Sequence, residues 1–166
     1  MHGLMMNTPL QISSLIRHAD RCHGDTAIVS RLVEGGIHRY TYGEAHRRAR
    51  QLANALESLN VRAPDCVGTL AWNGFRHFEL YYAVSGIGAV CHTINPRLFP
   101  EQIAYIINHA DDQYVFVDLT FVPLVEQLAA ALSSIEKVIV RGASARSSSW
   151  SPSRGARSSA RRCWPS

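Results

Sequence analysis

Two side chains near the amino terminus have the types and the spacing of metal ligands. His18 and Cys22 are four residues apart, and on a helix residues at this spacing lie on one face. Imidazole nitrogen and thiolate sulfur are ligands that structural zinc sites use. No further ligands cluster around them at a recognisable spacing, so we interpret both as ordinary surface or core residues and predict no metal site.

The glycine pair in Gly86-Ile87-Gly88 could belong to a loop that binds the pyrophosphate of a dinucleotide. That fingerprint needs a third glycine, where this sequence has Cys91. It also needs a strand before the loop and a helix after it, whereas here the pattern predicts a helix before and a strand after. We therefore interpret the pair as a turn from a helix into a strand.

The sequence also has no recognisable motif for gripping a triphosphate. It contains no G-x-x-x-x-G-K-[ST] loop, and Lys137 is its only lysine. The four cysteines, Cys22, Cys66, Cys91 and Cys163, are far apart and form no C-x-x-C pair. Their spacing argues against a disulfide scaffold or a zinc site and is typical of a reducing compartment.

The positive charge of the chain is concentrated at its carboxyl end. Residues 1–140 contain 11 basic and 13 acidic side chains, whereas residues 141–166 contain six arginines, nine serines and no acidic residue. Such a segment lacks the apolar periodicity of a folded core, so we predict a disordered tail. It could be an arm that binds nucleic acid, or a stretch of G/C-rich DNA read out of frame. We favour the second interpretation and do not expect nucleic acid as a partner.

Membrane and secretory segments are not predicted. The longest uncharged run, residues 80–96, falls short of the roughly 20 apolar residues that a membrane span needs. Residues 1–9 lack the basic and apolar regions of a secretory signal, and we expect them to be flexible. We therefore expect a cytoplasmic protein without a membrane span.

The elements that would position any site begin with a helix and a hairpin. A helix is expected over residues 10–22, with Ile12, Leu15, Ile16 and Ala19 as its apolar stripe. Strands over 27–32 and 37–41 would form a β-hairpin. Thr41 and Glu44 have the spacing of a capping box, which opens the next helix. We expect the arginines of that helix, Arg47, Arg48 and Arg50, to face solvent.

The following residues alternate strands and helices. Strands are expected over 66–71, 89–94, 114–117 and 137–140, and helices over 75–85, 101–109 and 121–132. This β-α-β-α-β-α-β order predicts an α/β fold: a partial doubly wound, mostly parallel sheet, preceded by the helix and the hairpin. We expect residues 89–94 to form a buried strand, and residues 10–140 to form one domain.

Several of these segments together resemble a known family. They are Tyr40–Glu44, Trp72-Asn73, Glu79–Val84, Gly88–Leu98, Phe99–Ile103 and Phe116-Val117-Asp118. In this combination, residues 10–140 resemble the N-terminal part of the AMP-forming acyl-CoA synthetases, and above all the branch of the fatty-acid–CoA ligases.

The resemblance implies a reaction in two steps. With ATP and Mg²⁺, a fatty-acid carboxylate attacks the α-phosphorus to give an acyl-adenylate, and the thiol of CoA then displaces AMP. The phosphate loop of the family, its acidic metal-binding motifs and its catalytic lysine have no counterpart here. We therefore expect a truncated ligase that is inactive alone, with no catalytic or metal-binding residue of its own and no tight binding of ATP, CoA or Mg²⁺.

The resemblance also implies three residues that border a substrate. Arg97, at the Asn95-Pro96-Arg97 turn, would meet a phosphate of the CoA nucleotide, a role that suits a guanidinium group. His77 and Tyr81 would line the acyl tunnel. The alternatives are a surface arginine that anchors the turn and, for Tyr81, packing in the core.

Other classes of function remain open at this point. The sheet could belong to a stand-alone nucleotide-binding or interaction module, because parallel sheets bind ligands at the carboxyl ends of their strands. A truncated sheet would also expose an unpaired edge strand, so self-association through that edge is expected.

Overall fold

The computed structural model describes residue 3 and residues 7–142. Its elements run along the chain as α1 (Ile12–His23), β1 (Ala27–Arg31), β2 (Ile37–Thr41), α2 (Tyr42–Ser58), β3 (Cys66–Leu70), α3 (Phe75–Gly86), β4 (Val90–Thr93), α4 (Pro100–His109), β5 (Asp112–Asp118), the 3-10 turn Leu119–Phe121, α5 (Val122–Leu128), the 3-10 turn Ala129–Ala131 and β6 (Lys137–Arg141). The predicted order of helices and strands is therefore confirmed.

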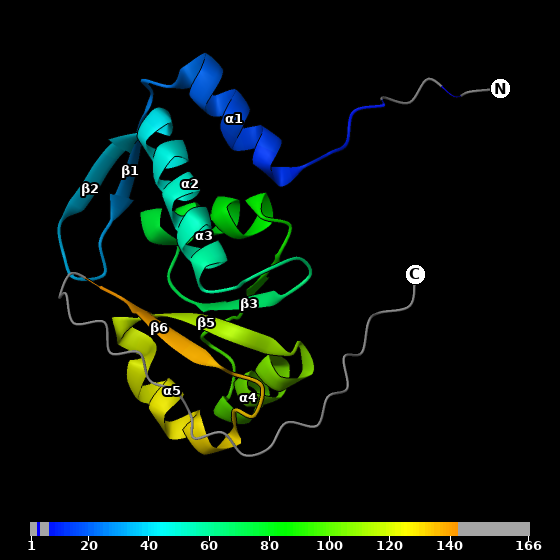
Figure 1. Cartoon of the computed structure of the whole chain (residues 1–166). Helices are drawn as coiled ribbons and strands as arrows, with labels where there is room; N and C mark the ends of the chain where they lie inside the picture. The colour runs from blue at the N-terminus through cyan, green and yellow to red at the C-terminus, as the bar shows by residue number, and fades with distance from the viewer. Residues whose placement is uncertain (1–2, 4–6, 143–166) are drawn as a thin grey trace.

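The four later strands form one parallel sheet with the order β4-β3-β5-β6. In Figure 1, α4 and α5 lie on one side of this sheet, and α1, α2, α3 and the antiparallel β1–β2 hairpin lie on the other. Because both faces are covered, the strands in the middle can be apolar throughout. The structure is thus the predicted α/β fold with a partial doubly wound sheet.

Each face of the sheet has its own hydrophobic core. The core beneath α4 and α5 includes Ile103, Ile107 and Val115. The core beneath α2 and α3 includes Leu56, Leu80 and Val67. A smaller cluster joins α1 to the hairpin and α3, with Ile16 and Tyr40 among its members. Only Ile16 of the predicted apolar stripe of α1 is buried, whereas Ile12 and Leu15 are exposed.

The prediction that residues 89–94 form a buried strand was wrong in one respect. The strand, β4, lies at an edge of the four-stranded sheet, and Val90 is 47% exposed. An uncharged, apolar run is compatible with either position. The strand order depends on contacts between distant residues, which the run itself does not encode.

The last strand ends one residue later than the predicted 137–140. Arg141 was expected to begin the tail, but it is the last residue of β6 and its guanidinium pairs with Asp118. The rest of the expected tail, residues 143–166, and most of the expected flexible N-terminus, residues 1–9, lie outside the described residues. None of the helices in the described residues has the length and apolar character to cross a bilayer.

Candidate functional site

Parallel strands place their carboxyl ends at one edge of a sheet, where α/β proteins commonly bind ligands. Here the segments that follow β3, β4 and β5 leave from this edge, and β6 ends there. These segments carry Trp72 after β3, Arg97 after β4 and Leu119 after β5. The carboxyl edge is therefore the candidate site.

One carboxylate joins three strand ends at this edge. Asp118, the last residue of β5, accepts a hydrogen bond of 2.8 Å from the backbone N–H of Trp72. It accepts another of 2.9 Å from Nη2 of Arg141 at the end of β6. The Arg141 side chain is 9% exposed; its burial lowers the pKa of the guanidinium, and the Asp118 carboxylate opposes this effect. The pair fixes the geometry of the edge.

Sequence reasoning did not assign this role to Asp118 and Arg141. The available signal was the position of Asp118 at the end of an apolar strand, where polar side chains commonly face a ligand site. Its partner, Arg141, was assigned to the basic tail because it is the first arginine of that arginine-rich segment.

His77 and Tyr81 lie together on α3. His77 is buried, and its Nδ1 lies 3.2 Å from the hydroxyl oxygen of Thr69 on β3. Burial lowers the pKa of His77 and Arg141 lowers it further, while Asp118 raises it. The ring of His77 contacts that of Tyr81 edge to face, at 4.9 Å between centroids. Tyr81 is 38% exposed, so it forms an accessible aromatic surface backed by a histidine that favours its neutral form.

Arg97 lies on a separate segment, between β4 and α4. Its backbone N–H donates a 3.0 Å hydrogen bond to Oδ1 of Asn95, which shapes the turn. Pro100 begins α4 in the first turn, where its missing N–H costs nothing. The Arg97 side chain is exposed and forms no ion pair within the described residues. It is chemically suited to a phosphate monoester.

The described residues do not fit a triphosphate with its metal ion. Among them, no group of three His, Cys, Asp or Glu side chains could hold a metal. His18 and Cys22 do lie together, with Nδ1 and Sγ 3.7 Å apart, but they lie on α1. At the carboxyl edge, the guanidinium of Arg141 already forms an ion pair with Asp118. We therefore derive no reaction step through ATP or Mg²⁺.

The two glycines of the rejected dinucleotide loop behave as predicted. Gly86 ends α3, and Gly88 precedes β4 with a φ of 80°. That left-handed conformation favours glycine, and it is common just after a helix. The pair forms a turn from a helix into a strand.

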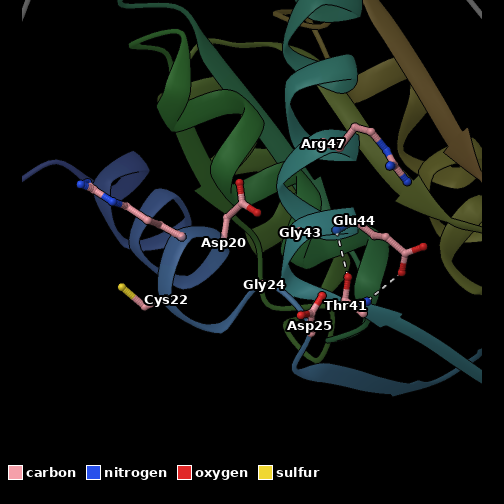
Figure 2. Close-up of a pocket in the computed structure, with 9 residues that line it drawn as sticks. Asp20, Cys22, Gly24, Asp25, Thr41, Gly43, Glu44 and Arg47 are labelled. Carbon is pink, nitrogen blue, oxygen red and sulfur yellow. Dashed lines mark hydrogen bonds between the residues drawn. The ribbon is translucent and has the colours of Figure 1, made fainter.

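A surface hollow of about 500 Å³ lies away from the sheet, where α1 meets the hairpin and α2 (Figure 2). Two of its carboxylates already have partners. Asp20 lies 2.7 Å from Nδ1 of His46, and Glu44 accepts from the backbone N–H of Thr41 in the predicted capping box. Figure 2 shows these reciprocal bonds between Thr41 and Glu44. The hollow is therefore built by the start of α2 and is not a second candidate site.

Comparison with known proteins identifies the family. Residues 15–163 match the family described as AMP-binding enzyme. The chain belongs to this family. It is 52% identical over 142 residues to the 3-methylmercaptopropionyl-CoA ligase of Ruegeria lacuscaerulensis, covering 86% of this chain and 26% of that protein. It is 46% identical over 140 residues to the medium-chain-fatty-acid–CoA ligase of Ectopseudomonas oleovorans, covering 84% and 26%.

Solved structures agree with this assignment to the AMP-binding enzymes. The anthranilate CoA ligase AuaEII, in complex with anthranoyl-AMP, matches with a TM-score of 0.70 and 25% identity over 81% of this chain and 26% of that chain. The N-terminal domain of FACL13 from Mycobacterium tuberculosis matches with a TM-score of 0.69 at 20% identity, which shows the shared fold. The chain thus spans about a quarter of the length of the curated ligases cited above. The predicted resemblance to acyl-CoA ligases is confirmed.

Proposed function

We propose that this AMP-binding chain is a truncated acyl-CoA ligase of the fatty-acid type. In the intact enzyme the reaction would join a fatty-acid carboxylate to CoA through an acyl-adenylate, with ATP and Mg²⁺ as cofactors. The observation that carries the proposal is the 52% identity to a CoA ligase over 142 residues, which cover only 26% of that enzyme. The short chain would supply scaffold and part of one wall of the cleft.

Three side chains would contribute that wall. Tyr81, backed by His77, offers an aromatic surface beside which an acyl chain could lie. Arg97 offers an exposed guanidinium without an ion-pair partner in the described part of the chain, and this group can bind a phosphate of CoA through paired hydrogen bonds. When bound to the intact enzyme, ATP would supply the adenylyl group that activates the carboxylate, with pyrophosphate as the leaving group. The residues described here only border the substrates.

A pyrophosphate-release assay tests the truncated-ligase proposal. The purified chain, given octanoate, ATP, Mg²⁺ and CoA, should release no pyrophosphate above a blank without protein. The full-length medium-chain ligase of Ectopseudomonas oleovorans is the positive control. Release of pyrophosphate by the chain alone would contradict the proposal, because it would require a phosphate-binding machinery that we do not find in the sequence.

A ligand-observed NMR experiment tests Arg97 separately. We expect weak binding of CoA to the chain, and weaker binding of 3′-dephospho-CoA, because the second ligand lacks one phosphate. In Arg97→Ala the difference between the two ligands should disappear. Arg62→Ala is the matched control, since Arg62 is also exposed but lies before β3. If Arg97→Ala still bound CoA more tightly than 3′-dephospho-CoA, Arg97 would not be part of the proposed site.

A further inference from the structure

An ion pair crosses β3 near the amino ends of β3 and β5, away from the side chains of the candidate site. His92 lies on edge strand β4 and Asp112 on β5, and β3 runs between these two strands. Nδ1 of His92 and Oδ2 of Asp112 are 2.7 Å apart. The Asp112 side chain is 0% exposed, whereas that of His92 is 24% exposed. Two side chains from non-adjacent strands therefore meet above the strand that separates them.

The residue beneath this contact is Gly68 of β3, which pairs with His92 in the parallel ladder. A Cβ atom at position 68 would lie 2.9 Å from Oδ2 of Asp112 and 3.1 Å from its Cγ. Contacts shorter than van der Waals distance are costly in a packed interior. The absence of a side chain at Gly68 leaves the space in which the pair forms.

We propose that His92 and Asp112 form a proton-linked clamp that holds edge strand β4, and with it the turn that carries Arg97, on the sheet. β4 has four residues and, within residues 7–142, one neighbouring strand. Short edge strands have few ladder hydrogen bonds and open readily. A charge-assisted hydrogen bond to a third strand adds an attachment that the ladder does not supply. This inference does not depend on the proposed ligase function.

The linkage to protons follows from the surroundings of the two groups. Burial raises the pKa of Asp112, and the hydrogen bond to His92 opposes this effect. The same hydrogen bond raises the pKa of His92 above its ordinary value of 6.5, against the effect of burial. Oδ1 of Asp112 is buried without a hydrogen-bond partner in the described structure. A protonated His92 is therefore the main compensation for this buried carboxylate.

The other ionisable groups near the pair act mainly on Asp112. Asp111 raises the pKa of Asp112 further, because two carboxylates repel. Cys66 on β3 and Cys91 on β4 both have raised pKa values, primarily from burial, so they favour the neutral thiol near pH 7. They add no negative charge there.

The ionisable groups on the helices packed against these strands either have other partners or are exposed. On α3, which packs against β4, Arg76 pairs with Glu34, Glu79 with Arg48, and His77 lies beside Thr69. On α4, which packs against β5, the rings of Tyr105 and His109 stack on each other, and Glu101 is exposed in the first turn. Asp112 is thus the carboxylate that raises the pKa of His92.

Deprotonation of His92 should weaken the clamp as pH rises. A group whose pKa is raised by folding stabilises the folded state fully below its unfolded pKa, and this stabilisation is lost as pH rises through its folded pKa. For His92 the loss begins near pH 6.5 and continues to the higher pKa of the folded state. We expect β4 to open more often as pH increases through this window.

NMR of the whole chain tests the clamp directly. The ring signals of His92 should titrate with a pKa above 6.5, and Asp112→Asn should lower this pKa. Amide exchange of residues 90–93, corrected for the intrinsic effect of pH, should lose about tenfold in protection for each unit by which the pKa is raised. His92→Gln should remove this pH dependence, while His109→Gln, at an exposed histidine on α4, should preserve it.

Two results would overturn the proposal. One is a His92 that titrates at or below 6.5 in the unmodified chain, a measurement that needs no variant to fold. The other is protection of residues 90–93 with the same pH dependence in His92→Gln as in the unmodified chain. Gly68→Ala should reproduce the low protection of His92→Gln at pH 6, because the added methyl group displaces the Asp112 carboxylate.

Discussion

Arg48 and Glu79 illustrate a contact that joins two helices at the scale of single side chains. Nε of Arg48 on α2 lies 2.6 Å from Oε1 of Glu79 on α3, and Glu79 is buried. The sequence predicted a solvent-facing arginine, because α2 has three arginines within four residues. Nothing in that local pattern shows that one of them reaches a buried carboxylate 31 positions later. The prediction of a solvent-exposed arginine holds for Arg48, whose side chain is 46% exposed, but its ion pair with Glu79 was not predicted.

Removal of the Arg48 charge should destabilise the fold. Arg48→Met keeps much of the aliphatic stem but leaves Glu79 buried without its partner, and we expect a loss of about 2 kcal/mol in the free energy of unfolding. Urea denaturation followed by circular dichroism measures the change. Arg47→Met, one position earlier on α2 and exposed, should cost less than about 0.5 kcal/mol. Equal losses in the two variants would show that the ion pair adds no stability.

His77 should make the fold sensitive to acid. Because burial and Arg141 lower its pKa below 6.5, stability is present above that value and is lost as pH falls through the lower pKa of the folded state. In an NMR titration, His77 should therefore have a lower midpoint than His92, whose pKa is raised. The reverse order of the two midpoints would contradict the environments described for both residues.

At the scale of helices and strands, the sequence predicted the features that depend on a few neighbouring residues. It did not predict the order of the strands in the sheet. The capping box of Thr41 and Glu44 was predicted correctly, because it needs only two residue types three positions apart. The hairpin and the parallel strands were also predicted, from turn residues and apolar runs. The order β4-β3-β5-β6 was not, since it depends on which strands meet after the helices have packed.

Loss of the capping box should weaken α2. Thr41→Ala removes the hydroxyl that accepts the N–H of Glu44, and we expect a loss of about 1 kcal/mol in the free energy of unfolding. Thr41→Ser retains a hydroxyl and should lose much less. Thermal and urea denaturation compare the two variants. If Ser and Ala substitutions are equally destabilising, packing of the threonine methyl group must account for the loss.

At the scale of the whole molecule, β4 and β6 are the edge strands of the sheet in the part of the chain that the structure describes. Edge strands present unpaired backbone groups that can bind another chain. We expect the purified chain to self-associate as its concentration rises. Val90 is an exposed apolar side chain on β4, and a lysine there would place a charge on the edge.

Sedimentation velocity over a range of concentrations tests this expectation. Val90→Lys should shift the distribution toward monomer. Leu15→Lys serves as the control, because Leu15 is also an exposed apolar residue but lies on α1, away from the sheet. Dissociation by Leu15→Lys alone would show that the apolar surface of α1, and not the sheet edge, mediates contact between copies.

The carboxylate of Asp118 binds both the Trp72 backbone and Arg141, and this limits which residues can occupy position 118. A side chain at position 118 must be anionic, short and placed between two donors from different strands. If every substitution at this position is scored for soluble expression, few should be tolerated, and even glutamate should fail because its extra methylene displaces the carboxylate. At Phe99, which is 73% exposed, most substitutions should be accepted.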